Sequence, residues 1–134
     1  MGLSCLRYKA YDWAKQRWLT QKLFYRGLPY RHYDTVSISG TVIDCAHKSA
    51  DGDVDFDLQA EAPAYLVALS KRWHLECTPC QPDALRAQIA GLKIGQRITV
   101  TGTRTFDNDH HIFAWKFGGG HWEVHPVTNI KEET

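Results

Sequence analysis

The hydrophobic positions of the N-terminal part of the chain follow a helical period. From Tyr8 to Arg26 there is no proline or glycine, and apolar residues recur at spacings of three and four until Gly27 and Pro29 interrupt the pattern. The resulting apolar stripe, flanked by basic side chains, comprises Tyr11, Ala14, Trp18, Leu19 and Leu23. We therefore predict a helical arm over residues 1–34, whose stripe either caps one end of the following domain or contacts a partner.

From Thr35 onward the apolar positions alternate with polar ones, which is the period of a strand with one buried face. The alternation recurs in five segments, at residues 36–43, 53–58, 72–77, 95–103 and 121–125. The Ser-Ala-Asp-Gly sequence at 49–52 predicts a turn that joins the first two strands in a hairpin. Between the third and fourth strands, residues 82–90 predict a short helix with Asp83 as its N-cap.

Five strands with one helix between the third and the fourth have the order of the OB-fold, a small β-barrel. Two glycines inside the first and fourth strands, Gly40 and Gly102, suit the tight bends of such a barrel. A three-helix bundle does not accommodate the alternations, and a doubly wound sheet needs more crossover helices. We predict a mainly β protein, with an N-terminal helical arm over residues 1–34 and a five-stranded OB-type barrel over residues 35–134.

Charge is distributed unevenly between these two parts. Residues 1–34 carry seven Lys or Arg against two Asp, a net of +5, whereas the remainder carries nine basic and thirteen acidic side chains, a net of −4. The basic residues of the arm are Arg7, Lys9, Lys15, Arg17, Lys22, Arg26 and Arg31. Any electrostatic attraction for nucleic acid therefore has to begin in the arm.

Apolar runs and cysteines bear on the cellular environment. The chain has no run of 18 apolar residues and no apolar segment of a secretory signal near its N-terminus, so we expect a cytoplasmic protein without a membrane span. Of the four cysteines, only Cys77 and Cys80 have a C-x-x-C spacing, and no second pair completes a zinc site. Buried, reduced cysteines are favoured over a redox pair or half of a zinc site.

Polar residues of the last strand and of the first hairpin turn carry candidate metal chemistry. Alternate residues of a strand point to one side at intervals of roughly 6.5–7 Å, so neighbouring members can share one ion. The candidate ligands are His47, Asp51, Asp53, His121, Glu123 and His125. Carboxylate oxygens suit Mg²⁺, Ca²⁺ or Mn²⁺, and imidazole nitrogens suit Zn²⁺, so any of these divalent ions is a candidate. The alternative is a solvated turn and an exposed polar strand face.

A second set of residues is suited to binding a nucleic-acid strand. OB barrels bind ligands on the face of their second and third strands and in the adjoining loops, where aromatic rings stack on bases and basic groups contact phosphates. The candidates are Lys15, Arg17, Trp18 and Lys22 in the arm, Arg72, His74 and Glu76 in the third strand, and Phe113 and Trp115 in the loop before the fifth. On the same face, Asp53, Asp55 and Asp57 repel phosphates unless a metal ion bridges the charges.

Four motifs of the barrel carry a resemblance to a known group of proteins. They are His47 with the Asp51-Gly52-Asp53 turn, Leu75-Glu76 followed by Pro79, the segment 95–102, and the closing His121-Trp122-Glu123-Val124-His125-Pro126-Val127 strand. Together they resemble a group of small bacterial OB-fold-like proteins with an Asp-Gly-Asp turn and a closing Trp-x-Glu-Ile/Val-His-Pro-Val strand. The likeness covers about residues 35–130. It implies the fold and assigns no activity.

These observations leave three functions open. The first, favoured narrowly by the fold and the basic arm, is a binding module for single-stranded nucleic acid or an oligonucleotide. The second is a divalent-metal-dependent phosphodiester hydrolase. The third is a scaffold or interaction domain that self-associates or binds a protein through the arm. The sequence contains no Ser-His-Asp pattern, P-loop or dinucleotide fingerprint, so acyl transfer, nucleotide-triphosphate hydrolysis and hydride transfer are not indicated.

Overall fold

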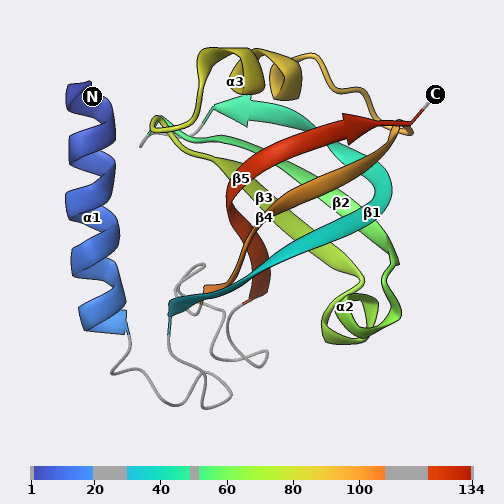
Figure 1. Cartoon of the computed structure of the whole chain (residues 1–134), viewed down its shortest axis with the longest axis horizontal. Coiled ribbons are helices and arrows are strands. Elements are labelled where there is room, and N and C mark those ends of the chain that lie inside the picture. Colours follow the sequence, from blue (N-terminus) through green and yellow to red (C-terminus); the bar gives the residue numbers. More distant parts are fainter. Residues whose placement is uncertain (1, 20–29, 49–51, 108–120, 134) are drawn as a thin grey trace.

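The computed structural model describes residues 2–19, 30–48, 52–107 and 121–133. Its strands wind into a barrel, helix α1 lies along the side of the barrel, and α3 and α2 lie at opposite ends (Figure 1). The elements are α1 (Leu3–Leu19), β1 (Arg31–Lys48), β2 (Val54–Ala62), α2 (Ala64–Leu69), β3 (Arg72–Cys77), α3 (Asp83–Ala90), β4 (Arg97–Asp107) and β5 (His121–Glu132). None of the described helices is long and apolar enough to cross a membrane.

The barrel closes in the strand order β1-β2-β3-β5-β4, with β4 pairing back onto β1. Neighbouring strands are antiparallel except β3 and β5, which run parallel. Because alternate residues of a strand point to opposite faces, each strand gives one row of side chains to the interior and one to the outside. The predicted OB-type barrel, its first hairpin and the helix between the third and fourth strands are confirmed.

Gly40 in β1 and Gly102 in β4 stand where neighbouring backbones approach closely. A Cβ built on Gly40 would lie 2.1 Å from the carbonyl oxygen of Gln59, and one on Gly102 would lie 2.3 Å from that of Pro126. Both glycines also adjoin a register shift in the pairing of their strands. No side chain fits at such distances, so glycine is required where these strands bend across their neighbours.

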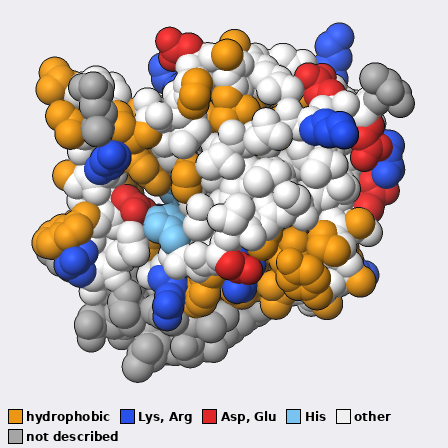
Figure 2. Space-filling view, viewed as in Figure 1, with side chains coloured by type: hydrophobic (Ala, Val, Ile, Leu, Met, Phe, Trp, Pro, Cys, Tyr) orange, Lys and Arg blue, Asp and Glu red, His pale blue; other side chains and the backbone are white. Residues whose placement is uncertain are grey.

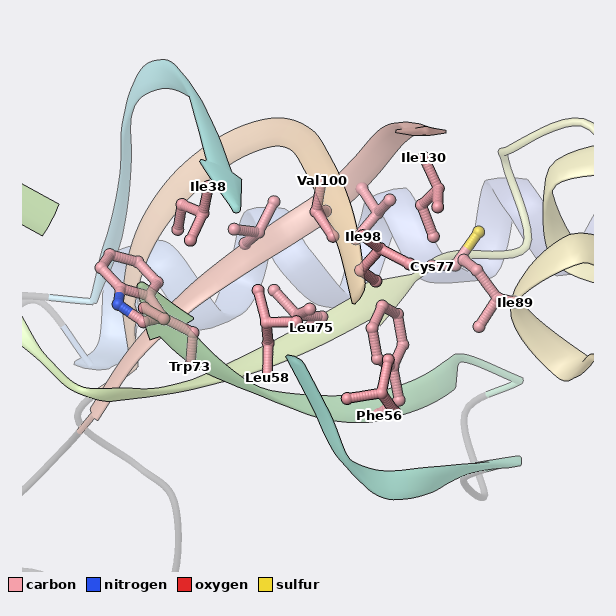
Figure 3. Close-up of a cluster of buried hydrophobic side chains, with 14 of the residues drawn as sticks. Ile38, Phe56, Leu58, Trp73, Leu75, Cys77, Ile89, Ile98, Val100 and Ile130 are labelled. Atoms are coloured by element: carbon pink, nitrogen blue, oxygen red, sulfur yellow. The ribbon is translucent and has the colours of Figure 1, made fainter. Parts of the chain in front are cut away.

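The barrel interior is apolar and closed to solvent. Figure 3 shows side chains from several strands meeting there, among them Ile38, Phe56, Leu58, Trp73, Leu75, Ile98 and Val100. Phe56, Trp73 and Leu75 have no exposed surface. Ile89 of α3 and Leu66 of α2 are also fully buried, so each of these helices contributes to the core. Burying a side chain of this size stabilises the fold by roughly 1.5–3 kcal/mol.

Two strands, β1 and β5, extend furthest beyond the predicted alternation. β1 begins at Arg31 because it continues to pair with β4 beyond the alternating segment, with Arg31 opposite Phe106. β5 continues to Glu132, through a cis peptide bond before Pro126, because its second half pairs with the first half of β4. Pairing with a strand that is distant in the sequence sets the ends of both strands. Hydrophobic alternation within one segment carries no information about this pairing.

The short helices also differ from the prediction. Residues Ala64–Leu69 form α2, which was not predicted, and bury Leu66 against the barrel. The N-cap of α3 is Pro82, not the predicted Asp83, and no side chain caps this helix by a hydrogen bond. Pro82 holds the extended backbone that precedes the helix, so Asp83 becomes its first helical residue.

The described polar contacts of helix α1 with the barrel come from residues outside the predicted apolar stripe. The side chains of Trp18 and Leu19, and all of Leu23, lie outside the described residues. Tyr8, Asp12 and Lys15 lie four and three residues apart and therefore share one side of the helix. The Tyr8 hydroxyl lies 2.8 Å from Nε2 of His125, and Nζ of Lys15 donates to Asp107 at 3.1 Å. Tyr11 of the predicted stripe is 55% exposed. The helix presents polar groups because the outer face of the barrel is polar at this place.

A disulfide between Cys5 and Cys80 joins α1 to the segment that follows β3. The expectation that Cys77 and Cys80 are buried and reduced is therefore wrong for Cys80. Cys77 is buried and free as expected, whereas Cys45 is free but exposed. The two bonded residues are 75 positions apart in the sequence, so no local spacing reveals their pairing.

Candidate metal centre

The outer faces of β2, β3 and β5 gather acidic and imidazole side chains at one place. Cross-strand partners stand in register there, with Asp57 opposite His74, Asp55 opposite Glu76, and His74 opposite Glu123. The residues that come close enough to share an ion form the histidine–carboxylate cluster, which comprises Asp53, Asp55, His74, Glu76, Asp107, His121, Glu123 and His125.

Much of this cluster is buried, although it lies outside the barrel. Asp53 and Glu123 are each 1% exposed and His125 is 5% exposed. Helix α1 covers the surface, and Figure 2 shows histidine and acidic side chains in the gap where α1 meets the barrel. The predicted alternatives of a solvated turn and an exposed polar strand face are therefore wrong for these three residues.

His125 is the centre of the cluster. Its Nδ1 lies 2.8 Å from a carboxylate oxygen of Glu76 and 3.4 Å from Oε1 of Glu123. Its Nε2 lies 2.8 Å from the hydroxyl of Tyr8 and 3.7 Å from Oδ2 of Asp53. Burial alone would lower the pKa of His125, but hydrogen bonds to Glu123 and Glu76 hold that pKa well above its usual range.

Two further histidines flank this centre and are also held by carboxylates. His74 places Nδ1 at 2.7 Å from Asp57 and Nε2 at 3.2 Å from Glu76. Burial opposes its charge, yet these bonds raise the pKa of His74 to about 11. His121 places Nε2 at 2.6 Å from Glu123, and this bond outweighs burial to raise the pKa of His121.

The pKa values of the carboxylates shift in the opposite direction to those of the histidines. Burial raises the pKa of Glu76, but hydrogen bonds from His125 and His74 bring that pKa well below its ordinary value. The pKa of Glu123 is raised by burial and by the charge of Glu76, and is lowered overall by hydrogen bonds from His121 and His125. Ionised carboxylates are thus held in a largely dry site.

Helix α1 adds a second layer of polar contacts beside the cluster. Asp12 accepts a hydrogen bond from the Tyr30 hydroxyl at 2.9 Å and lies 3.0 Å from Nε2 of His32. Burial raises the pKa of Asp12, but the bond to His32 lowers it overall. Burial, followed by the charge of Asp12, raises the pKa of Tyr8. The helix therefore supplies both a cover and oriented polar groups.

Three ligand sets can be drawn from the described cluster residues, each with ligand atoms within 4.8 Å of one another. They are Asp53 with Glu76 and His125, Asp55 with His74 and Glu76, and Asp107 with His121 and Glu123. The first two sets share Glu76, and the third reaches the first through the 3.4 Å approach of Glu123 to His125. Each set combines one imidazole with two carboxylates, which is a donor combination that divalent metals accept.

The charge of the cluster also favours a cation. Its five carboxylates face the three histidines and Lys15, so among these described groups negative charge exceeds positive charge even when every imidazole is protonated. The Oε1 atom of Glu123 is buried, and its approach to Nδ1 of His125 is a long one of 3.4 Å. Burying ionised carboxylates costs free energy unless opposite charge compensates them, and a divalent ion supplies such charge.

The structure brings together most of the residues expected to bind metal. Asp53, His121, Glu123 and His125 lie in the cluster, whereas Asp51 lies outside the described residues. His47 is an exception, because its side chain is exposed and lies 3.2 Å from the carbonyl oxygen of Cys45. Its inclusion rested on nearness in sequence to the turn, and the structure does not bring it into the cluster of described residues. Asp107 and Tyr8 were missed because no local motif marks them.

The residues expected to bind nucleic acid are dispersed. His74 and Glu76 belong to the cluster, and Lys15 pairs with Asp107 beneath α1. Arg17 is exposed and stacks over Trp13, with its guanidinium carbon 3.8 Å from the ring centre. Arg72 is exposed at the edge of the cluster and donates to Asp57. Lys22, Phe113, Trp115 and the side chain of Trp18 lie outside the described residues.

Comparison with known proteins supports the fold. No protein family and no curated protein matches the chain. Among solved structures, it is similar to a small single-stranded DNA-binding protein from Streptomyces coelicolor, with a TM-score of 0.53 and 12% sequence identity. The match covers 75% of this chain and 92% of that one. At this identity the likeness concerns the OB-type fold alone.

Proposed function

We propose that this protein is an OB-fold metal-binding protein that holds divalent ions in the histidine–carboxylate cluster. The observation that supports this most strongly is the burial of Glu123 between His121 and His125, with Glu76 on the far side of His125. A stabilising role alone does not account for this arrangement, because apolar residues of similar size would avoid the desolvation cost.

The donor set indicates which ions fit. Ca²⁺ and Mg²⁺ prefer oxygen ligands alone, whereas imidazole suits Zn²⁺ and other transition metals, and carboxylates are also accepted by Mn²⁺. Each ligand set contains one histidine. Zn²⁺ and Mn²⁺ are therefore favoured, and the Glu76 carboxylate shared by two sets would allow two ions to lie side by side.

Calorimetric titration of metal-stripped protein with Zn²⁺, Mn²⁺, Mg²⁺ and Ca²⁺ tests this proposal. We expect Zn²⁺ or Mn²⁺ to bind, and Glu123→Gln or His125→Gln to weaken binding by roughly 100-fold or more, since ligand loss exceeds the effect of losing an outer partner. Glu61→Gln is the matched control, because Glu61 is an exposed β2 carboxylate that pairs with Arg97. Absence of binding by all four ions, or unchanged affinity in both cluster variants, contradicts the proposal.

Single-stranded nucleic-acid binding is a second candidate function. It is favoured by the fold likeness to a single-stranded DNA-binding protein and by the outer side of α1. There Arg7, Lys9, Arg17 and Trp13 are exposed, a combination suited to phosphates and bases. The usual OB ligand face does not favour it, because that face carries the acidic cluster and is covered by α1.

Fluorescence anisotropy with a labelled oligothymidylate separates this candidate from metal binding. If α1 binds the strand, the combined Arg7→Ala, Lys9→Ala and Arg17→Ala variant should bind more weakly and show a shallower dependence of affinity on salt. Glu123→Gln should leave that affinity unchanged. Equal affinity of the triple variant and the wild-type protein eliminates the α1 surface as the binding site.

A further inference from the structure

A cavity of about 350 Å³ lies on the outer face of the barrel beside the histidine–carboxylate cluster. Asp57, Arg72, His74, His121 and Trp122 line it. They come from β2, β3 and β5, so rigid strands rather than a loop hold its described walls. Its size is at the lower end of the range for small-molecule sites.

The cavity adjoins two of the proposed ligand sets. His74 belongs to one set and His121 to another, and the centres of their rings lie 5.6 Å apart. Contacts from α1 reach His125 and Asp107, whereas none of the described residues that line the cavity belongs to α1. A molecule in this cavity therefore lies directly beside the proposed ions.

Arg72 gives the cavity a permanent positive group at its solvent side. Its side chain is 61% exposed, and its Nε donates to Asp57 at 2.7 Å. Asp44 is a weaker acidic neighbour, 4.0 Å from the guanidinium. A guanidinium has five donors, and it holds phosphate oxygens through two parallel hydrogen bonds. His74 also bonds to Asp57, so this carboxylate is shared by two cationic or donor groups.

Trp122 forms the apolar wall. Its ring packs on Phe106 with a centroid separation of 5.1 Å, and the guanidinium carbon of Arg104 lies 4.9 Å from the ring centre. Only 8% of Trp122 is exposed, so its position is fixed by its neighbours. The cavity thus joins a cationic edge, an apolar wall and a proposed metal side, which suits a ligand with an anionic group and a small organic part.

We propose that this cavity binds the phosphate group of a phosphate-ester ligand, with Arg72 holding phosphate oxygens beside the metal centre. This inference rests on the proposed function, because the ions neutralise the surrounding carboxylates and turn repulsion of phosphate into attraction. A phosphate fits better than a carboxylate, since its several oxygens can meet a guanidinium and a metal ion at the same time.

The test first measures metal affinity and then titrates phosphate ligands into metal-saturated protein by calorimetry. The ligands are inorganic phosphate, adenosine monophosphate and a short oligothymidylate, which distinguish a free anion, a mononucleotide and a strand. Arg72→Gln removes the guanidinium, and Lys71→Gln, at the exposed residue immediately before the same strand, is the control. Arg72→Lys keeps the charge but loses the paired donors.

We expect at least one ligand to bind, about tenfold or more weakly to Arg72→Gln, with an intermediate loss for Arg72→Lys and none for Lys71→Gln. Metal binding without binding of any phosphate ligand overturns the cavity assignment and leaves the metal centre standing. Phosphate binding that Arg72→Gln does not weaken overturns it as well. Absence of metal binding overturns the proposed function, and the cavity assignment falls with it.

Discussion

Two rows of side chains on the same three strands are both buried, yet their chemistry is opposite. Phe56, Leu75 and Val124 point into the barrel, whereas their neighbours Asp55, Glu76 and Glu123 point outward. Burial of the inner row stabilises the fold by removing apolar surface from water. Burial of the outer row costs free energy unless opposite charge compensates it. The inner row therefore explains why the chain folds, and the outer row points to what it binds.

The largest expected effect comes from a substitution in the inner, apolar row. Trp73→Ala removes the largest fully buried side chain and should lower the free energy of unfolding by about 3–5 kcal/mol. Urea denaturation measures this loss, with Ile94→Ala as the control because Ile94 is 61% exposed. A loss for Trp73→Ala no greater than that for the control would mean that the interior is not the source of stability.

The next effect concerns the helix that separates the outer row from water. Cys5→Ser removes the disulfide that fastens α1 and should cost roughly 2–4 kcal/mol of stability. It should also speed the release of metal to a chelator, because α1 covers His125. Cys45→Ser, at an exposed free cysteine, should change neither quantity. Chelation at the wild-type rate in the Cys5 variant would show that α1 does not control access.

Metal binding to the outer row should stabilise the folded protein. A ligand that binds only the folded protein adds about 2.7 kcal/mol of stability at a concentration one hundred times its dissociation constant. We expect this gain with Zn²⁺ or Mn²⁺ in the wild-type protein and in Ile94→Ala. His125→Gln should show no such gain, and thermal denaturation of metal-stripped and metal-loaded samples measures it. The same gain in His125→Gln would place the ion elsewhere.

A smaller effect follows from protonation. In the metal-free protein, carboxylates hold the pKa of His125 well above its usual value and that of His74 at about 11, so both imidazoles carry a proton at pH 7. Metal binding needs the neutral imidazole, and protons are therefore released and affinity falls as the pH falls. Calorimetry in two buffers with different ionisation enthalpies measures the release. A binding enthalpy that is independent of the buffer contradicts this expectation.

The sequence predicted the barrel because alternation within each strand is a local signal. The same alternation placed His121, Glu123 and His125 on one outer face. It did not predict that this face is buried, since the cover depends on α1 and on the bond between Cys5 and Cys80, which are 75 positions apart. His47 was included by nearness along the chain, whereas pairing between strands decides which side chains meet.

Metal binding in the histidine–carboxylate cluster can be seen directly in an anomalous difference map from crystals of the protein soaked in Zn²⁺, measured on the two sides of the zinc absorption edge. We expect a strong peak within coordination distance of His125, Glu76 or Glu123, inside the cover formed by α1. Peaks confined to surface sites, such as the exposed His47, with none in the histidine–carboxylate cluster would contradict it.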